Sequence, residues 1–236
     1  MEMSEETLKI YFMKEEINRA IEEFKKTNPR KDIIEILDRG ICYAENNPVN
    51  EILFTCINPA FNQKKSNKGI LPTFTFADAD QKIRYWKRLH TIVGDLLPKT
   101  AYLDLFPLIE TSQKKFEKTV PLELKKPLLI ITQKEIERIK PKLIIVGNRA
   151  SRAYWGAIKK YSWMGYKFEE IESPLKDKDV VVYRIVGLRD DNEKISSETC
   201  LQGTVVVFSS VSYCYPKVKT LSPENVKCLY EFASEI

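Results

Sequence analysis

Histidine is scarce in this sequence: His90 is the only one among 236 residues. Mechanisms that need two histidines, such as a two-histidine metal site, are therefore excluded, and a metal would have to bind to carboxylates. We expect no metal and no cofactor. His90 lies between Trp86 and Val93 on the apolar stripe of a predicted helix. This position favours a core histidine with satisfied ring nitrogens over a catalytic acid.

The patterns of disulfide-rich, secreted and membrane proteins are missing too. The five cysteines are an odd number without a CxxC pair, so we expect free thiols rather than a disulfide framework or a zinc ribbon. The chain has no apolar run of about 18 residues and no basic start followed by an apolar centre. These absences predict a cytoplasmic protein that does not contact a membrane, and we expect a monomer.

Apolar residues recur with helical spacing in some segments and form short aliphatic runs in others. Helices are predicted over residues 4–26, 32–45, 78–97, 127–139, 149–160 and 222–233. Strands are predicted over residues 51–57, 101–106, 143–146 and 204–208, and a hairpin over 166–172 and 180–186. Strands that are apolar on both faces are typical of a parallel sheet covered by helices. We therefore expect one α/β domain over residues 1–236, a three-layer α/β/α sandwich with a mainly parallel four-stranded central sheet.

The predicted strands end in residues that can take part in chemistry. These ends are Asn58-Pro59, Asp104, Gly147-Asn148 and the serine-rich segment 209–212. In a parallel α/β sheet, ligands bind outside the carboxyl ends of the strands. We expect the four ends to face one cleft, although Asn58-Pro59 by itself is also typical of a turn.

The stretch CINPAF, residues 56–61, resembles the Gly-Ile-Asn-Pro-Gly motif of the uracil-DNA glycosylase superfamily, particularly its mismatch-specific thymine/uracil branch. AYLDLFPL is similar to the family's second strand, and KPKLIIVGNRAS to its segment of proline, apolar strand, glycine and helix. VVVFSSVS falls where the family has a last strand that ends in His-Pro-Ser or Asn-Pro-Ser. The resemblance implies a DNA repair enzyme that flips a damaged or mismatched, uracil-type base out of DNA and hydrolyses its N-glycosidic bond.

Three residues receive catalytic roles from this resemblance. Asn58 would orient the attacking water through its carbonyl oxygen, while Ser210 and Ser212 would bind the leaving base or the flanking phosphate. Ser210 stands where the family has histidine or asparagine, and Val211 where it has proline. A hydroxyl donates more weakly than a positioned imidazole, so we expect a slower reaction.

The resemblance also implies residues that bind the substrate. The base would contact the residues Cys56, Ile57, Pro59, Ala60, Phe61, Asp104 and Tyr213. Phe61 would stack on the flipped base, and Tyr213 would insert into the duplex. Asp104 would read the edge of the base, and because an ionised carboxylate cannot donate, it would favour an edge rich in donors. Asp104 could otherwise cap the loop that follows it.

Two basic regions are candidates for contact with phosphate. Gly147, Asn148 and Arg149 open a predicted helix after a strand, where backbone N–H groups suit a phosphate; an ordinary turn is the alternative. The second region comprises a lysine-rich loop predicted over residues 113–126, with Lys114, Lys115, Lys118, Lys125 and Lys126, and the residues Lys217 and Lys219 after the last strand. The formal net charge of +5 is compatible with a polyanionic partner without requiring one.

Other functions remain open on the same fold. The expected partner is DNA, and another nucleic acid or a nucleotide is the alternative. A catalytically weak or inactive protein that binds nucleic acid or nucleotides is the principal alternative. A small-molecule hydrolase with Asp104 as its base is a third.

Overall fold

The computed structural model describes residues 5–28, 30–60, 73–158, 163–175, 180–190, 195–209 and 221–236, without the side chains of residues 5–12, 73 and 149. Its helices are α1 (Glu5–Thr27), α2 (Lys31–Leu37), α3 (Arg84–Val93), α4 (Gln113–Thr119), α5 (Leu122–Ile139), α6 (Arg152–Trp155) and α7 (Pro223–Glu235), with 3-10 turns at Gly94–Lys99 and Arg149–Ser151. Its strands are β1 (Tyr43–Glu45), β2 (Ile52–Cys56), β3 (Thr73–Thr75), β4 (Thr100–Asp104), β5 (Leu143–Val146), β6 (Tyr166–Ile171), β7 (Val182–Leu188) and β8 (Val205–Phe208). None of the helices in these ranges is long and apolar enough to cross a membrane.

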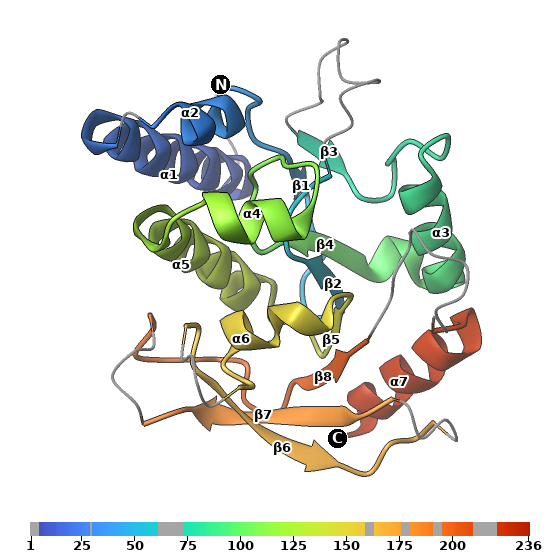
Figure 1. The fold of residues 1–236 in the computed structure, drawn as a ribbon. Helices are drawn as coiled ribbons and strands as arrows, with labels where there is room; N and C mark the ends of the chain where they lie inside the picture. The colour runs from blue at the N-terminus through green and yellow to red at the C-terminus, as the bar shows by residue number, and fades with distance from the viewer. Residues whose placement is uncertain are drawn as a thin grey trace.

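The central sheet has six strands in the order β4-β2-β5-β8-β7-β6 (Figure 1). Neighbouring strands among β4, β2, β5 and β8 pair in parallel, whereas β7 pairs antiparallel with β8 and with β6. The predicted hairpin is confirmed, but the prediction of a four-stranded sheet is wrong because the hairpin joins the sheet through β7. A separate two-stranded parallel sheet consists of β1 and β3.

Helices cover both faces of the sheet, and each face has its own core (Figure 1). The side chains of β5 show the division: Ile144 and Val146 pack with α1, α5 and α6, while Leu143 and Ile145 pack with α3 and α7. All four are fully buried. Alternate residues of a strand point to opposite faces, so a strand between two helix layers must be apolar throughout.

Three predicted helices are shorter than expected. The helix predicted to reach residue 45 ends at Leu37, because Gly40 turns the chain with φ +81° and Tyr43 enters β1. The helix predicted over 78–97 is α-helical only over Arg84–Val93, and Gly94, with φ +53°, ends it. The helix predicted over 149–160 contains one 3-10 turn and the four residues of α6.

The lysine-rich segment 113–126, predicted as a loop, is mainly helical. Ser112 accepts a hydrogen bond from the Lys115 backbone N–H and so caps α4, whose Phe116 is fully buried. Helix α5 begins at Leu122 rather than near residue 127 and includes Pro127. One buried apolar residue per helical turn is enough to fix such short segments on the core.

Strand β4 lies at one edge of the sheet, and the side chain of Asn47 covers its middle. The Tyr102 backbone N–H donates to Asn47 Oδ1 at 2.9 Å, and Asn47 Nδ2 donates to the Ala44 carbonyl at 3.2 Å. Asn47 is buried. An N–H group of the edge strand is thereby satisfied by a side chain rather than by another strand.

Candidate active site

The carboxyl ends of the four parallel strands lie at one edge of the sheet. Cys56, the last residue of β2, is the register partner of Asp104, the last residue of β4. On the other side of β2, Gly147 N–H donates to the Thr55 carbonyl at 2.8 Å, and Ser209 N–H donates to the Val146 carbonyl at 2.9 Å. Adjacent strands are about 5 Å apart, so the chain segments predicted to form the site do follow neighbouring strands.

The turn after β2 is tied to the segment after β4. Leu105 and Phe106 donate their backbone N–H groups to the carbonyls of Cys56 and Ile57, both at 2.9 Å. Further on, Glu110 N–H donates to the Pro59 carbonyl at 3.2 Å, and Ala60 forms a parallel bridge with Glu110. The two segments therefore continue the pairing of β2 and β4 beyond the strands.

A buried carboxylate secures this pairing. Glu110 is 1% exposed, and it accepts hydrogen bonds from Arg39 Nη1 at 2.9 Å and from the Thr111 hydroxyl at 2.6 Å. Lys115 lies 3.5 Å away. Burial alone would raise the pKa of Glu110, but the hydrogen bonds from Thr111 and Arg39 outweigh burial and hold the pKa below its usual value. Glu110 is thus ionised, and its backbone N–H holds the carbonyl of Pro59.

Asn58 presents a buried acceptor without a donor. Its Nδ2 donates to the Pro59 carbonyl at 3.0 Å, which fixes the orientation of the amide. Its Oδ1 is buried, and no residue within the described ranges donates a hydrogen bond to it. A buried, unsatisfied carbonyl costs about 1–3 kcal/mol, so this oxygen is in a state that an incoming donor would stabilise.

Asp104 is a buried carboxyl group, and one of its two oxygens accepts a hydrogen bond. It is 7% exposed, and the Tyr102 hydroxyl donates to its Oδ1 at 3.0 Å. Burial raises the pKa of Asp104 to about 7, although the Tyr102 hydrogen bond acts in the opposite direction. Asp104 was expected to be an ionised acceptor, but a pKa near neutrality means that the protonated form, which donates, coexists with the ionised form.

The thiols beside Asp104 are not nucleophiles at neutral pH. Burial, and next the charge of Asp104, raises the pKa of Cys56 to about 12, and the same two causes raise the pKa of Cys42 to about 12. Tyr85 Oη lies 3.4 Å from Cys56 Sγ and 2.7 Å from Tyr102 Oη. The thiols therefore serve as neutral walls of the site.

An aromatic cluster borders Asp104 on the α3 side of the sheet. Trp86 packs against Phe74 and Tyr102 with ring centroids 4.9 Å apart in both pairs, and Phe76 stacks on Tyr102 at 5.6 Å. His90 belongs to this cluster: its Nε2 is 2.8 Å from the Phe76 carbonyl, and its Nδ1 contacts the amide of Gln81. Both ring nitrogens are thus occupied, as expected, but His90 is half-buried at the edge of the cluster rather than in the core.

The proposed phosphate site after β5 differs from its prediction. Asn148 Oδ1 accepts from the Ala150 N–H at 2.8 Å, its carbonyl accepts from the Ser151 N–H at 3.0 Å, and its Nδ2 donates to Gln113. The backbone N–H groups of Ala150 and Ser151 are therefore used locally, and the Gly147 N–H already donates to the Thr55 carbonyl. The contact of Gly147 and Asn148 with phosphate stays a prediction, and the Arg149 side chain lies outside the described residues.

One lysine of the basic region is unavailable. Lys125 is 4% exposed and donates to Glu117 Oε2 at 2.7 Å, with its ammonium over the ring of Phe116. The expectation that Lys125 contacts phosphate was wrong, because Lys125 lies on the buried face of α5. Four residues with predicted roles in the site, Phe61, Ser210, Ser212 and Tyr213, lie outside the described residues, as do Lys217 and Lys219.

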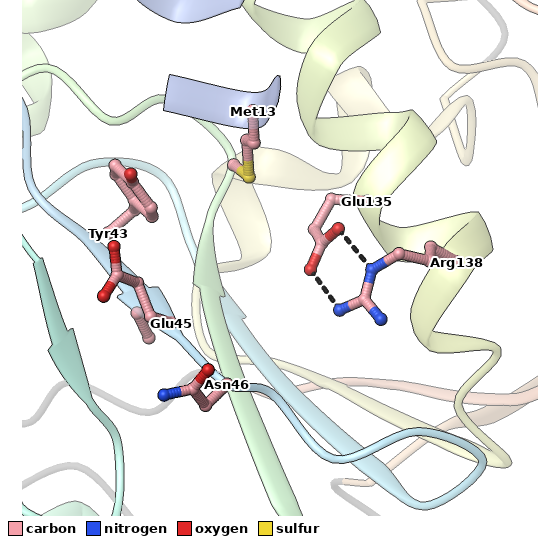
Figure 2. Close-up of a pocket in the computed structure, with 7 residues that line it drawn as sticks. Met13, Tyr43, Glu45, Asn46, Glu135 and Arg138 are labelled. Carbon is pink, nitrogen blue, oxygen red and sulfur yellow. Dashed lines mark hydrogen bonds and ion pairs between the residues drawn. The ribbon is translucent and has the colours of Figure 1, made fainter. Parts of the chain in front are cut away.

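Two pockets within the described residues lie away from these strand ends. One is a small hollow between α1, β1 and α5, where Glu135 and Arg138 form two hydrogen bonds of 2.7 Å (Figure 2). Its lining residues are Met13, Tyr43, Ala44, Glu45, Asn46, Glu135 and Arg138. The other is lined by residues 170–173, 175 and 180–182 at the end of the hairpin. Neither includes Asn58 or Asp104, so the cleft at the strand ends stays a prediction.

Two hydroxyl groups of the site, those of Tyr102 and Tyr85, were not predicted from the sequence. Tyr102 precedes Asp104 by two residues on one strand, so the alternation of strand faces already placed the two side chains on the same face. Tyr85 comes from α3, and nothing in the sequence links it to Cys56. Compared with known proteins, the chain matches no family model and no curated protein.

Proposed function

We propose that the protein hydrolyses the N-glycosidic bond of a base that has been flipped out of DNA. The observation that carries the proposal is the Oδ1 atom of Asn58, which is buried at the carboxyl end of β2 and receives no hydrogen bond from the described part of the chain. A water that donates to this oxygen would have its lone pair directed away from the amide. The family resemblance of residues 56–61 suggests the same role.

Asp104 contributes the second function of the site. The water oxygen forms a bond to the sugar carbon, the carbon–nitrogen bond breaks, and the electron pair of that bond leaves with the base. One proton of the water then neutralises the base. A protonated Asp104 donates to the oxygen of the base on which negative charge develops, and its Tyr102 hydrogen bond leaves Oδ2 for this contact.

The test measures base release from oligonucleotides that contain uracil, hypoxanthine or a thymine mismatch. Wild-type protein should produce abasic sites, and Asn58→Ala should reduce their rate of formation by about 10²-fold or more. Asn18→Ala, which changes an exposed asparagine of α1, is the matched control and should act as wild type. Absence of abasic sites with every substrate would refute the proposal.

A second candidate is a hydrolase of small molecules in which Asp104 is the general base. The raised pKa of Asp104, about 7, favours it, because a base works best when its pKa is near the working pH. Free nucleosides in the same assay separate the two candidates. Release of base from nucleosides but not from oligonucleotides would support the second candidate.

A further inference from the structure

Two tyrosine hydroxyls connect the Asp104 carboxyl to α3. Tyr102 Oη lies 3.0 Å from Asp104 Oδ1, and Tyr85 Oη lies 2.7 Å from Tyr102 Oη. Cys56 Sγ, 3.4 Å from Tyr85 Oη, ends this row of polar groups. Tyr102 is buried, while Tyr85 is half-buried in the first turn of α3 and packs edge-on against Trp86 at 4.7 Å. The row is therefore held by the core on the α3 side of the sheet.

The number of protons fixes the direction of these hydrogen bonds when Asp104 is ionised. A carboxylate only accepts, so the bond of 3.0 Å uses the proton of the Tyr102 hydroxyl. A hydroxyl has a single proton, so the bond of 2.7 Å uses the proton of Tyr85. The thiol of Cys56 supplies the proton of the remaining contact. Every donor in the row thus points toward Asp104.

The same row decides which oxygen of Asp104 takes up a proton. Within the described ranges Oδ2 accepts no hydrogen bond, so its protonation leaves every bond of the row in place. Protonation of Oδ1 would require both tyrosine hydroxyls to reverse, and Tyr85 would then donate to the Cys56 sulfur, a weak acceptor. The row therefore favours the proton on Oδ2.

The titratable side chains described next to Asp104 are those of Tyr85, Tyr102, Cys42 and Cys56. Burial, and next the charge of Asp104, raises the pKa of Tyr102 well above its ordinary value. The pKa of each thiol is about 12. Within the described ranges no cation pairs with Asp104. Tyr102 and the two thiols therefore stay protonated while Asp104 titrates.

We infer that Tyr85 is a positioning residue for the reaction: through Tyr102 it keeps the Asp104 proton on Oδ2, the oxygen that donates to the departing base. The inference rests on the proposed function for the identity of the acceptor. A misplaced proton disables a catalytic group whose geometry is otherwise intact, as a catalytic imidazole in the wrong tautomer shows. A hydroxyl that accepts a hydrogen bond is also a stronger donor, so Tyr85 strengthens the bond with which Tyr102 stabilises ionised Asp104.

The first measurement is the pKa of Asp104 without substrate, followed by NMR of protein labelled at its aspartate carboxyl carbons. Asp104→Asn identifies the signal by its loss. Tyr102→Phe removes the donor to Oδ1 and should raise the pKa by about 1–2 pH units. Tyr85→Phe keeps that donor and should raise the pKa by a smaller amount. The matched control is Tyr183→Phe, which removes a half-buried hydroxyl from β7 on the other face of the sheet and should leave the pKa unchanged.

The second measurement is the rate of base release as a function of pH, with circular dichroism to check the folding of each variant. Wild-type release should fall as the pH rises through about 7, because protonated Asp104 is lost. Both phenylalanine variants of the row should move this midpoint upward in step with the pKa of Asp104. At about pH 5, Tyr85→Phe should release base several-fold more slowly, since part of the protein then carries the proton on Oδ1. A loss of packing alone would lower the rate without moving the midpoint.

The two measurements separate failure of the inference from failure of the proposed function. A rise of the Asp104 pKa in Tyr85→Phe, together with an upward midpoint of release, would support the inference. An unchanged Asp104 pKa in Tyr85→Phe would refute the inference and leave the proposed function standing. If wild-type protein releases no base, the proposed function and the role of Tyr85 in it are refuted, whereas the direction of the hydrogen bonds is still decided by the pKa of Asp104 in the variants.

Discussion

Replacing Asp104 by asparagine should remove a specific pH dependence of stability. The substitution keeps the shape of the side chain and an oxygen that can accept from the Tyr102 hydroxyl. It removes the group whose pKa burial raises from 3.8 to about 7. In wild-type protein the native state therefore keeps its proton between about pH 4 and 7, where the unfolded chain has lost it.

The magnitude follows from this difference in proton binding. Since the native state holds more protons in that window, the stability contributed by Asp104 is fully present below the unfolded pKa and falls as the pH rises through the folded pKa. The full loss is about 4 kcal/mol for the rise from 3.8 to about 7. Between about pH 5 and about pH 8 the loss is roughly 3 kcal/mol.

Urea unfolding followed by tryptophan fluorescence at these two pH values measures the effect. The difference in free energy of unfolding between Asp104→Asn and wild type cancels the contributions of all other titrating groups. This difference should shift by roughly 3 kcal/mol in favour of the variant as the pH rises. Equal pH dependence of the two proteins would show that Asp104 has an ordinary pKa and would remove the physical basis for its role as a donor.

Two further predictions concern the frame of the site. Glu110→Gln should lower the free energy of unfolding by about 3 kcal/mol, because it removes the buried negative charge that accepts from Arg39 at 2.9 Å and lies 3.5 Å from Lys115. The control is Glu231→Gln, which removes the exposed ion pair with Lys227. This variant should lose little stability in the same urea titration. Gly156→Ala should destabilise more than Gly203→Ala by about 1–3 kcal/mol, since both have positive φ but only at Gly156 would a Cβ lie 3.0 Å from backbone atoms. Equal losses at the two glycines would contradict this reasoning.

The strands of the sheet could be predicted well from the sequence, and their pairing to a lesser degree. The aliphatic run 143–146 is β5 without any change of bounds, because four apolar residues in succession have few alternatives between two helix layers. The two hairpin strands were also recognised. That β7 would pair with β8 and widen the sheet depends on contacts between residues about twenty positions apart, which periodicity does not report.

Helix ends were harder to predict because they depend on backbone conformation. Gly94 takes φ +53° and ends α3, although the apolar pattern continues beyond it. Helix α4 was missed since four of its seven residues are charged, and only the capping Ser112 and the buried Phe116 reveal it. Lys125 is a similar case: its burial depends on Glu117, eight residues earlier.

The positions of the strand ends in the candidate site could be predicted from the sequence, whereas the protonation of its side chains could not. The ends of β2 and β4 were correctly expected at one edge, because parallel strands must present their carboxyl ends together. The protonation of Asp104 could not be predicted, since it depends on how completely α3 and its aromatic side chains exclude water.

The buried amide of Asn47 bears on self-association. An unprotected edge strand is a template on which other chains can build fibrils. Here a second molecule would have to displace the Asn47 side chain before it could pair with the middle of β4. The opposite edge, β6, exposes Lys167, Glu169 and Glu170, whose charges oppose docking of a like strand. Both borders of the sheet therefore resist polymerisation, one by occlusion and the other by charge.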